Sequence, residues 1–285
     1  MLQLKESNRQ ENKSLVYSVF SRRAGGLSVG IDLFPDKKQC SFDCPYCEVF
    51  PFSSETVFSL RRMEEELRQA IDAGRNAQVM DICFSGNGEP TLSPHFAEAL
   101  AAAGRLRAEL VPSAKLVLIT NGSGFLDGNI FALLKEAAFS PGLDIWLKLD
   151  SGTPDWYGKI NRSSIPFQNI IDKAKEFASC APFTIQTMLC AIDGCSPPPE
   201  EDAAWEKMIL QFGEIAASSA AEGRGGGIRK VQIYGKARSA PEDPKAEALP
   251  VDCLESRAES LRAALREKAL FAGKNPDIKI VEVYP

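Results

Sequence analysis

Cys40-Ser41-Phe42-Asp43-Cys44-Pro45-Tyr46-Cys47 contains three cysteines at C-x3-C-x2-C spacing. This spacing allows three thiolates to converge on one inorganic centre, and soft thiolate ligands select zinc, copper(I) or iron–sulfur clusters. A structural zinc ion usually takes four protein ligands, but the single histidine is His95 and the next cysteine is Cys83. Three cysteines therefore favour a [4Fe–4S] cluster that keeps one iron free for a small molecule.

A second motif follows the next strand that the sequence predicts. Val79–Phe84 is a short apolar run typical of a buried strand, and it leads into Ser85-Gly86-Asn87-Gly88-Glu89-Pro90-Thr91. The two glycines allow the backbone to approach a ligand closely. Glu89 adds a carboxylate at the end of this strand, so the segment has the features of a ligand-binding loop.

Polar residues also end the next two predicted strands. The run Lys115–Thr120 leads into Asn121, and residues 144–150 carry Lys148 and Asp150 two positions apart, on the same side of a strand. A buried lysine and aspartate must be paired or used, because unpaired charge inside a protein is costly. Strand ends that carry chemistry are typical of the C-terminal face of an α/β barrel.

Together these motifs resemble the radical S-adenosylmethionine superfamily. The cysteine motif with Tyr46 before its last cysteine, followed one strand later by the Gly-Asn-Gly-Glu-Pro segment, carries the resemblance. It implies that Cys40, Cys44 and Cys47 hold a [4Fe–4S] cluster whose open iron is chelated by S-adenosyl-L-methionine. The Ser-Arg-Arg and Gly-Ile-Asp segments before the cysteine motif resemble those of iron–sulfur oxidoreductases that are related to wyosine-type tRNA-modifying enzymes.

The resemblance also implies roles for individual residues. Tyr46 is expected beside the adenine, and Asp150 near the ribose of the cosubstrate. The glycine-rich segment is expected to hydrogen-bond the amino group of the cosubstrate through Gly86, Asn87, Gly88 and Glu89. Thr120 and Asn121 are expected to line the cosubstrate pocket. Most members have adjacent glycines where this chain has Asn87 between Gly86 and Gly88.

Strands and helices alternate along the chain, which predicts a parallel sheet. Strands are expected near residues 16–20, 27–33, 79–84, 115–120, 144–150, 183–190, 230–236 and 278–283. The resemblance implies a partial TIM barrel, (β/α)6, with a core domain over residues 27–237. Residues 1–26 are expected to form an N-terminal extension, and residues 238–285 a helix and strand packed on the core.

The implied activity is a radical reaction. A reduced cluster passes one electron to S-adenosylmethionine, and the resulting 5′-deoxyadenosyl radical takes a hydrogen atom from a substrate. A reductant such as flavodoxin or ferredoxin is implied. One alternative is modification of tRNA, favoured by Arg22, Arg23, Lys37, Lys38, Arg61 and Arg62 but disfavoured by the net charge of −5. Another is a non-enzymatic metal- or redox-sensing module, against which the glycine-rich segment argues.

Composition sets further expectations. The 285 residues are 44% hydrophobic and 25% charged, as in ordinary globular proteins, with no apolar run of membrane-spanning length. The polar start of the chain has no signal-peptide pattern, so a cytoplasmic protein is expected. Four further cysteines could in principle bind an auxiliary cluster, namely Cys180, Cys190, Cys195 and Cys253. They contain no tight C-x2-C pair, which favours buried thiols instead.

Overall fold

The computed structural model describes residues 13–74, 77–223, 225–268, 270 and 281–285. Its central feature is a curled sheet in which neighbouring strands follow the order β1-β2-β3-β4-β5-β6-β7-β9. The strands are β1 (Val16–Ser21), β2 (Gly26–Ile31), β3 (Val79–Phe84), β4 (Lys115–Thr120), β5 (Leu143–Lys148), β6 (Pro182–Ile192), β7 (Gly227–Gly235) and β9 (Val281–Tyr284). From β2 onward every neighbouring pair is parallel, whereas β1 is an antiparallel edge strand.

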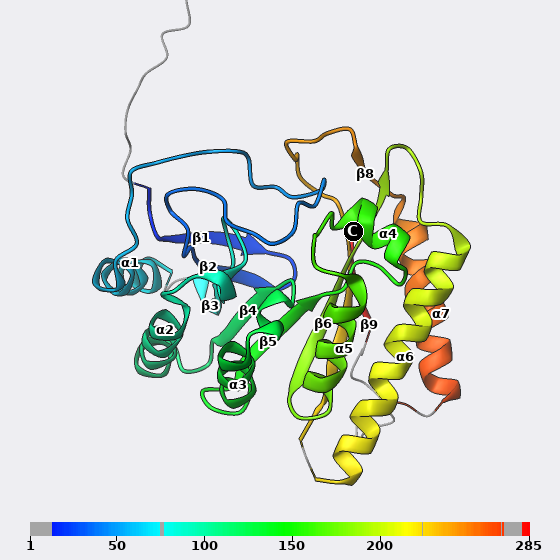
Figure 1. The fold of residues 1–285 in the computed structure, drawn as a ribbon. Helices are drawn as coiled ribbons and strands as arrows, with labels where there is room; N and C mark the ends of the chain where they lie inside the picture. The colour runs from blue at the N-terminus through cyan, green and yellow to red at the C-terminus, as the bar shows by residue number, and fades with distance from the viewer. Residues whose placement is uncertain (1–12, 75–76, 224, 269, 271–280) are drawn as a thin grey trace, which may run out of the picture.

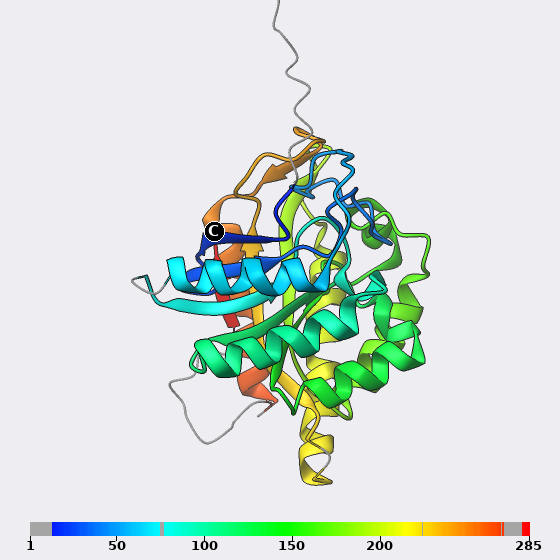
Figure 2. The same ribbon diagram turned by 90° about the vertical axis from the view of Figure 1, so that its left-hand side faces the viewer.

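Helices connect the parallel strands and, with one exception, cover the convex face of the sheet (Figures 1 and 2). They are α1 (Leu60–Ala73), α2 (Phe96–Leu110), α3 (Gly128–Ala137), α4 (Pro154–Ile160), α5 (Phe167–Ala178), α6 (Pro199–Ala221) and α7 (Val251–Glu267). The exception is the short α4, which lies at the end of the half-barrel near β8 (Ala246–Ala248). Each crossover returns the chain to start the next strand in the same direction, as expected for βα units. The predicted partial TIM barrel is therefore confirmed.

The alternation of side chains along β5 shows how the layers are built. Leu143, Ile145 and Leu147 belong to the main hydrophobic core beneath the helices. Trp146, between Ile145 and Leu147, and Lys148, after Leu147, point to the opposite face, where they line a cavity inside the curled sheet. The inner face of the half-barrel thus carries polar side chains, and these are available to a ligand.

Several element boundaries differ from the sequence prediction. Ser93 and Pro94 are residue types that commonly begin a helix. α2 nevertheless begins at Phe96, because Pro90–Leu92 forms a short 3-10 turn first and the Ser93 hydroxyl accepts the His95 amide at 3.2 Å. The sequence analysis did not predict α4 or the short strand β8 (Ala246–Ala248), which pairs with β6. Both are too short to give a clear periodic pattern.

Both predicted extensions contribute strands to the sheet. β1 pairs with β2, and β9 pairs with β7. Residues 1–12 and 278–280, which belong to the predicted extension and last strand, lie outside the described residues. The domain boundaries at 26/27 and 237/238 stay predictions. In the part of the chain that the structure describes, no helix is long and apolar enough to cross a membrane.

Candidate active site

The cysteine loop follows β2, and it is held on the glycine-rich segment that follows β3. The Gln39 amide donates to the Asn87 carbonyl at 3.0 Å, and the Glu89 amide donates to the Gln39 carbonyl at 2.8 Å. Gly88 lies directly at this crossing, where an added Cβ would be 1.9 Å from the Gln39 carbonyl oxygen. Only a glycine allows the two backbones to approach so closely, so Gly88 fixes the position of Cys40 next to it.

Glu89 is buried beneath this crossing. One carboxylate oxygen accepts the Thr91 hydroxyl at 2.6 Å and the Thr120 hydroxyl at 2.7 Å, and the other accepts the Asn121 amide at 2.7 Å. Burial raises the pKa of Glu89, although these hydrogen bonds oppose the rise. Glu89 therefore joins the ends of β3 and β4, and the structure places it as a support for the pocket wall.

Asn121 connects the end of β4 to the cysteine loop. Its side-chain amide donates to the Cys40 sulfur at 3.5 Å and to the Ser41 hydroxyl at 3.0 Å. Thr120 supports this turn from below, because its hydroxyl accepts the Gly122 amide at 3.1 Å. The two residues predicted at this strand end thus contact the predicted cluster ligand and Glu89.

Asp150 joins four segments of the site, although it is only 2% exposed. One carboxylate oxygen accepts the Tyr46 hydroxyl and the Asn161 side-chain amide, the latter at 2.9 Å. The other accepts the Met188 backbone amide at 2.8 Å and lies 3.4 Å from the Lys148 ammonium. The Lys148–Asp150 ion pair anticipated from the sequence is present in the structure.

Lys148 lies between two aromatic rings. Its ammonium is 4.5 Å from the centre of the Tyr46 ring and 4.8 Å from that of Tyr234, and it donates to the Tyr234 hydroxyl. Burial opposes the charge of Lys148, but the Asp150 carboxylate, together with the Tyr234 and Cys44 side chains, outweighs burial and raises the pKa of Lys148. Lys148 is therefore held as a cation inside the site.

Two residues in this network were not identified as site residues from the sequence. Asp32, at the end of the Gly-Ile-Asp strand, accepts the Phe34 amide at 3.0 Å and the Asn87 side-chain amide. Asn161, which ends α4, donates to the Cys44 sulfur at 3.6 Å as well as to Asp150. The strand-end position of Asp32 was an available signal, whereas nothing local marks Asn161.

Two further arginines of this region are engaged in ion pairs within the protein. Arg162 forms a 2.8 Å ion pair with Glu242, and Arg238 forms one at 3.1 Å with Glu48. The partly exposed side chain of His95 lies 2.6 Å from Glu98 and stacks on Phe58.

The four later cysteines do not form one group. Cys190 is fully buried in a small core cluster with Tyr46 and Trp156, whereas Cys195 and Cys253 are exposed and Cys180 is half-buried.

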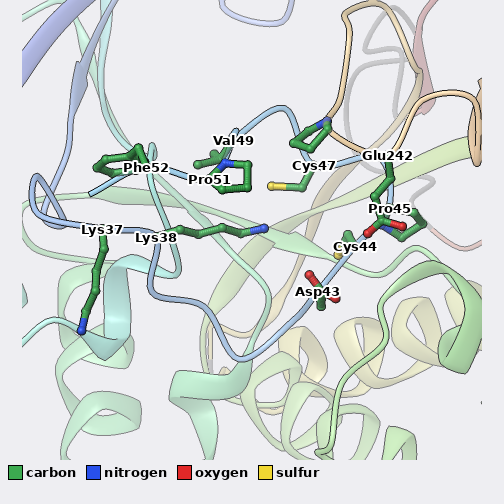
Figure 3. A pocket seen from close by; sticks show the side chains of 11 residues that line it. Lys37, Lys38, Asp43, Cys44, Pro45, Cys47, Val49, Pro51, Phe52 and Glu242 are labelled. Atoms are coloured by element: carbon green, nitrogen blue, oxygen red, sulfur yellow. The ribbon is translucent and has the colours of Figure 1, made fainter. Parts of the chain in front are cut away.

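The three cysteines of the motif are free thiols that fit the cluster ligand set. Cys44 and Cys47 line a pocket of about 370 Å³, into which Lys38 extends (Figure 3). Burial raises the pKa of the Cys40 thiol to about 11 and that of Cys44 to about 12. Amide donors reach Cys40 from Asn121 and Cys44 from Asn161, as expected around cluster sulfurs.

Among the described residues, no three His, Cys, Asp or Glu side chains are placed to share a single metal ion. A four-iron cluster has a different requirement, because each thiolate binds a different iron atom.

A cavity of about 810 Å³ opens beside this loop, inside the half-barrel. Its wall contains predicted cosubstrate residues, namely Tyr46, Gly86, Asn87 and Gly88. Cys47 lines both this cavity and the smaller pocket. The arrangement therefore joins a thiol-rich loop to a chamber large enough for small molecules.

Solved structures with the same fold include several radical S-adenosylmethionine enzymes. SuiB of Streptococcus suis, bound to S-adenosylmethionine, has a TM-score of 0.59 and 14% identity, covering 87% of this chain and 48% of SuiB. A radical SAM methyltransferase of Sphaerobacter thermophilus has a TM-score of 0.60 and 14% identity, and the match covers 87% of this chain and 66% of the methyltransferase. TYW1, with a lysine-pyruvate adduct bound, has a TM-score of 0.50 and 14% identity, and the match covers 83% of this chain and 72% of TYW1. At such identities the likeness concerns the fold.

Sequence relatives include proteins named UPF0026 protein. That of Helicobacter pylori is 32% identical over 135 residues, which is 45% of this chain and 41% of the relative. UPF0026 protein slr1464 of Synechocystis sp. is 27% identical over 187 residues, which is 61% of this chain and 64% of the relative. The chain thus spans less than two thirds of the length of these relatives. The family model described as the radical SAM superfamily matches residues 37–189, more than half of the chain. The chain therefore belongs to the radical SAM superfamily, a family of enzymes that use S-adenosylmethionine.

Proposed function

We propose that this chain binds a [4Fe–4S] cluster through Cys40, Cys44 and Cys47 and cleaves S-adenosylmethionine to take a hydrogen atom from a small molecule or peptide. When bound and reduced, the cluster supplies the electron that splits a carbon–sulfur bond of S-adenosylmethionine, giving a 5′-deoxyadenosyl radical. The observation that carries the proposal is that residues from several strand ends hold the three-cysteine loop beside a cavity of about 810 Å³.

The residues of this chain position the reactants. Gly86, Asn87 and Gly88 line the cavity, and we assign the amino group of S-adenosylmethionine to their backbone. Tyr46 also lines the cavity and is assigned to the adenine and ribose side. Asp150 supports Tyr46 from behind through the phenol hydroxyl, so it affects the cosubstrate through Tyr46.

Modification of tRNA is less well supported by the geometry. Arg61 and Arg62 form helix-surface ion pairs with Glu65 and Glu66, at 2.9 and 2.6 Å. Arg22 donates to the backbone carbonyl of Pro285. These three arginines are thus engaged within the protein, and the net charge of −5 opposes non-specific nucleic-acid binding.

The lysine-pyruvate adduct in the TYW1 structure raises the question of a reactive lysine. A lysine must lose its proton to attack a carbonyl group. Asp150 stabilises the charged form of Lys148 and raises its pKa, which is opposite to what such a nucleophile needs. We therefore assign Lys148 to binding and not to adduct formation.

Anaerobic reconstitution with iron and sulfide tests the proposed function. About four irons per chain and release of 5′-deoxyadenosine after reduction with S-adenosylmethionine are expected. Cys40→Ala, Cys44→Ala and Cys47→Ala should each abolish both readouts, whereas Cys253→Ala, at an exposed thiol far along the chain, should leave them unchanged. A full cluster in all three motif variants, or zinc retained without cosubstrate binding, would contradict the proposal.

A further inference from the structure

Two buried polar atoms in the wall of the half-barrel cavity have no hydrogen-bond partner in the described part of the chain. They are the indole nitrogen of Trp146 and the side-chain oxygen of Gln186. Trp146 is 3% exposed and Gln186 is fully buried, and both residues line the cavity of about 810 Å³. A buried polar atom without a hydrogen-bond partner costs free energy of folding, so a donor and an acceptor left unpaired in one cavity wall indicate a polar ligand.

The orientation of the Gln186 amide follows from its neighbours. Gln232 donates to the Glu282 carboxylate at 3.4 Å, and a carboxylate can only accept there. Gln232 must therefore present its oxygen to Gln186, whose nitrogen donates to it at 2.9 Å. The remaining atom of Gln186 is its oxygen. This relay across three strands leaves the cavity wall with one hydrogen-bond acceptor at Gln186 and one donor at Trp146.

Positive charge lies in the same cavity. Arg23 lines it, with its guanidinium 4.9 Å from the centre of the Tyr234 ring. Among the residues that the structure describes, this guanidinium makes no hydrogen bond or ion pair. Lys148 lies at the same tyrosine, 4.8 Å from its centre. The lining carboxylates are engaged: Asp81 accepts the Ser28 hydroxyl, Asp32 accepts from Asn87, and Glu48 pairs with Arg238.

Strand register places these groups in neighbouring layers of the barrel. Lys148 of β5 is paired with Gln186 of β6, and Gln186 with Gln232 of β7. Trp146 is two residues before Lys148 on the same face of β5. Gly86, Asn87 and Gly88 lie in the loop after β3, beyond the carboxyl end of that strand. Trp146 and Gln186 are therefore deeper in the half-barrel than the segment assigned to S-adenosylmethionine.

We propose that the substrate is a small anion, a carboxylate or phosphate ester, which also carries a hydrogen-bond donor, and that Arg23, Trp146 and Gln186 recognise it. This assignment rests on the proposed function for its catalytic meaning. Arg23 binds the anionic group, Gln186 accepts the donor through its oxygen, and Trp146 donates to an oxygen of the ligand. Lys148 lies in the same cavity, but Asp150 balances its charge, so Arg23 supplies the main contact to the anionic group.

Binding of simple probes tests this inference on the reconstituted full chain with S-adenosylmethionine present and the cluster oxidised. Glycolate and glycerol 3-phosphate carry both an anion and a hydroxyl, acetate lacks the hydroxyl, and ethylene glycol lacks the anion. Saturation-transfer NMR should detect the first two more strongly than the last two. Comparison of glycolate with glycerol 3-phosphate distinguishes a carboxylate from a phosphate as the anionic group.

Variants then assign the contacts. Arg23→Met is expected to weaken binding of the preferred probe about tenfold, since a charge-assisted contact is lost. Trp146→Phe, which removes the N–H and keeps an aromatic ring, is expected to weaken it about fivefold. Gln186→Met should act similarly, but it also removes the donor to Gln232, so Trp146→Phe is the cleaner variant. Arg22→Met, in the same turn but outside the cavity, is the matched control and should bind normally.

The outcomes separate this inference from the proposed function. Cleavage of S-adenosylmethionine by the wild type, with equal binding of all four probes or with unchanged binding in Arg23→Met and Trp146→Phe, would overturn the substrate assignment alone. Selective probe binding that these two variants weaken, in a protein that never releases 5′-deoxyadenosine, would support the anion site and contradict the proposed reaction. Thermal unfolding of each variant identifies a loss of binding that is due to misfolding.

Discussion

The hydroxyl of Tyr46, in the cysteine loop, donates a hydrogen bond to the carboxylate of Asp150, just beyond the end of β5. The two residues are 104 positions apart in the sequence, and each was expected near a different part of S-adenosylmethionine. Their contact makes them one unit, in which Asp150 orients the tyrosine that separates Cys44 from Cys47. Substitution of either residue should therefore affect both cosubstrate binding and the cysteine loop.

Asp150→Asn is expected to destabilise the protein by about 3 kcal/mol, because it leaves the buried Lys148 ammonium without its carboxylate partner. Tyr46→Phe keeps the ring beside Lys148 and should be milder, with cleavage of S-adenosylmethionine reduced about fivefold. Urea unfolding and 5′-deoxyadenosine release measure the two effects. Asp155→Asn, at an exposed position in α4, is the control. Equal stability of Asp150→Asn and the control would show that the ion pair is not required.

Gly88→Ala is expected to lower cluster incorporation at least about tenfold. The added methyl group would lie 1.9 Å from the Gln39 carbonyl oxygen, so the loop that carries Cys40 must move. Gly128→Ala provides a matched control, because a Cβ at Gly128 in α3 meets nothing within 4 Å. Iron and sulfide content after reconstitution measures the effect. Normal iron content in Gly88→Ala would mean that the cysteine loop does not depend on this crossing.

Asn161→Ala should make the reduction potential of the cluster more negative. The Asn161 amide donates to the Cys44 sulfur at 3.6 Å, and such donors stabilise the reduced, more negative cluster. A redox titration followed by electron paramagnetic resonance measures the shift. The exposed Asn169 in α5 supplies the control substitution, Asn169→Ala. A shift of the same size in both variants would contradict the role of this hydrogen bond.

Glu66→Gln tests a pH-dependent support of the N-terminal strand. Burial alone would raise the pKa of Glu66, but hydrogen bonds from Ser14, Arg62 and the amides of Leu15 and Val16 outweigh it, so the folded pKa is lowered. The resulting stability is present above the ordinary pKa of 4.5 and is lost as the pH falls through the lowered value.

At neutral pH the Glu66→Gln variant should therefore be less stable by about 1 to 2 kcal/mol, and the difference should shrink in acid. Urea unfolding over a pH series measures this dependence. Glu65→Gln removes an exposed partner of Arg61 in the same helix and should change stability little. A difference between Glu66→Gln and the wild type that stays constant into acid would rule out the carboxylate as its source.

Much of the fold was predictable because its signals are local. Apolar runs such as Val79–Phe84 and Lys115–Thr120 mark buried parallel strands, and both form the strands predicted for them. The short helix α4 and strand β8 gave no such pattern, since neither is long enough for a period to be read. α2 begins at Phe96 and not at the Ser93-Pro94 pair, because the 3-10 turn at Pro90–Leu92 takes up the preceding residues.

The sequence alone identified the family and located the three-cysteine motif and the glycine-rich segment, because each depends on residues close together along the chain. Tertiary structure alone decided which atoms face one another. It places Glu89 beneath the pocket as a support and brings Asn161 to Cys44. It also leaves the oxygen of Gln186 without a hydrogen-bond partner among the residues that the structure describes. These contacts join strand ends that are distant in sequence, and only the curling of the sheet brings them to one cavity.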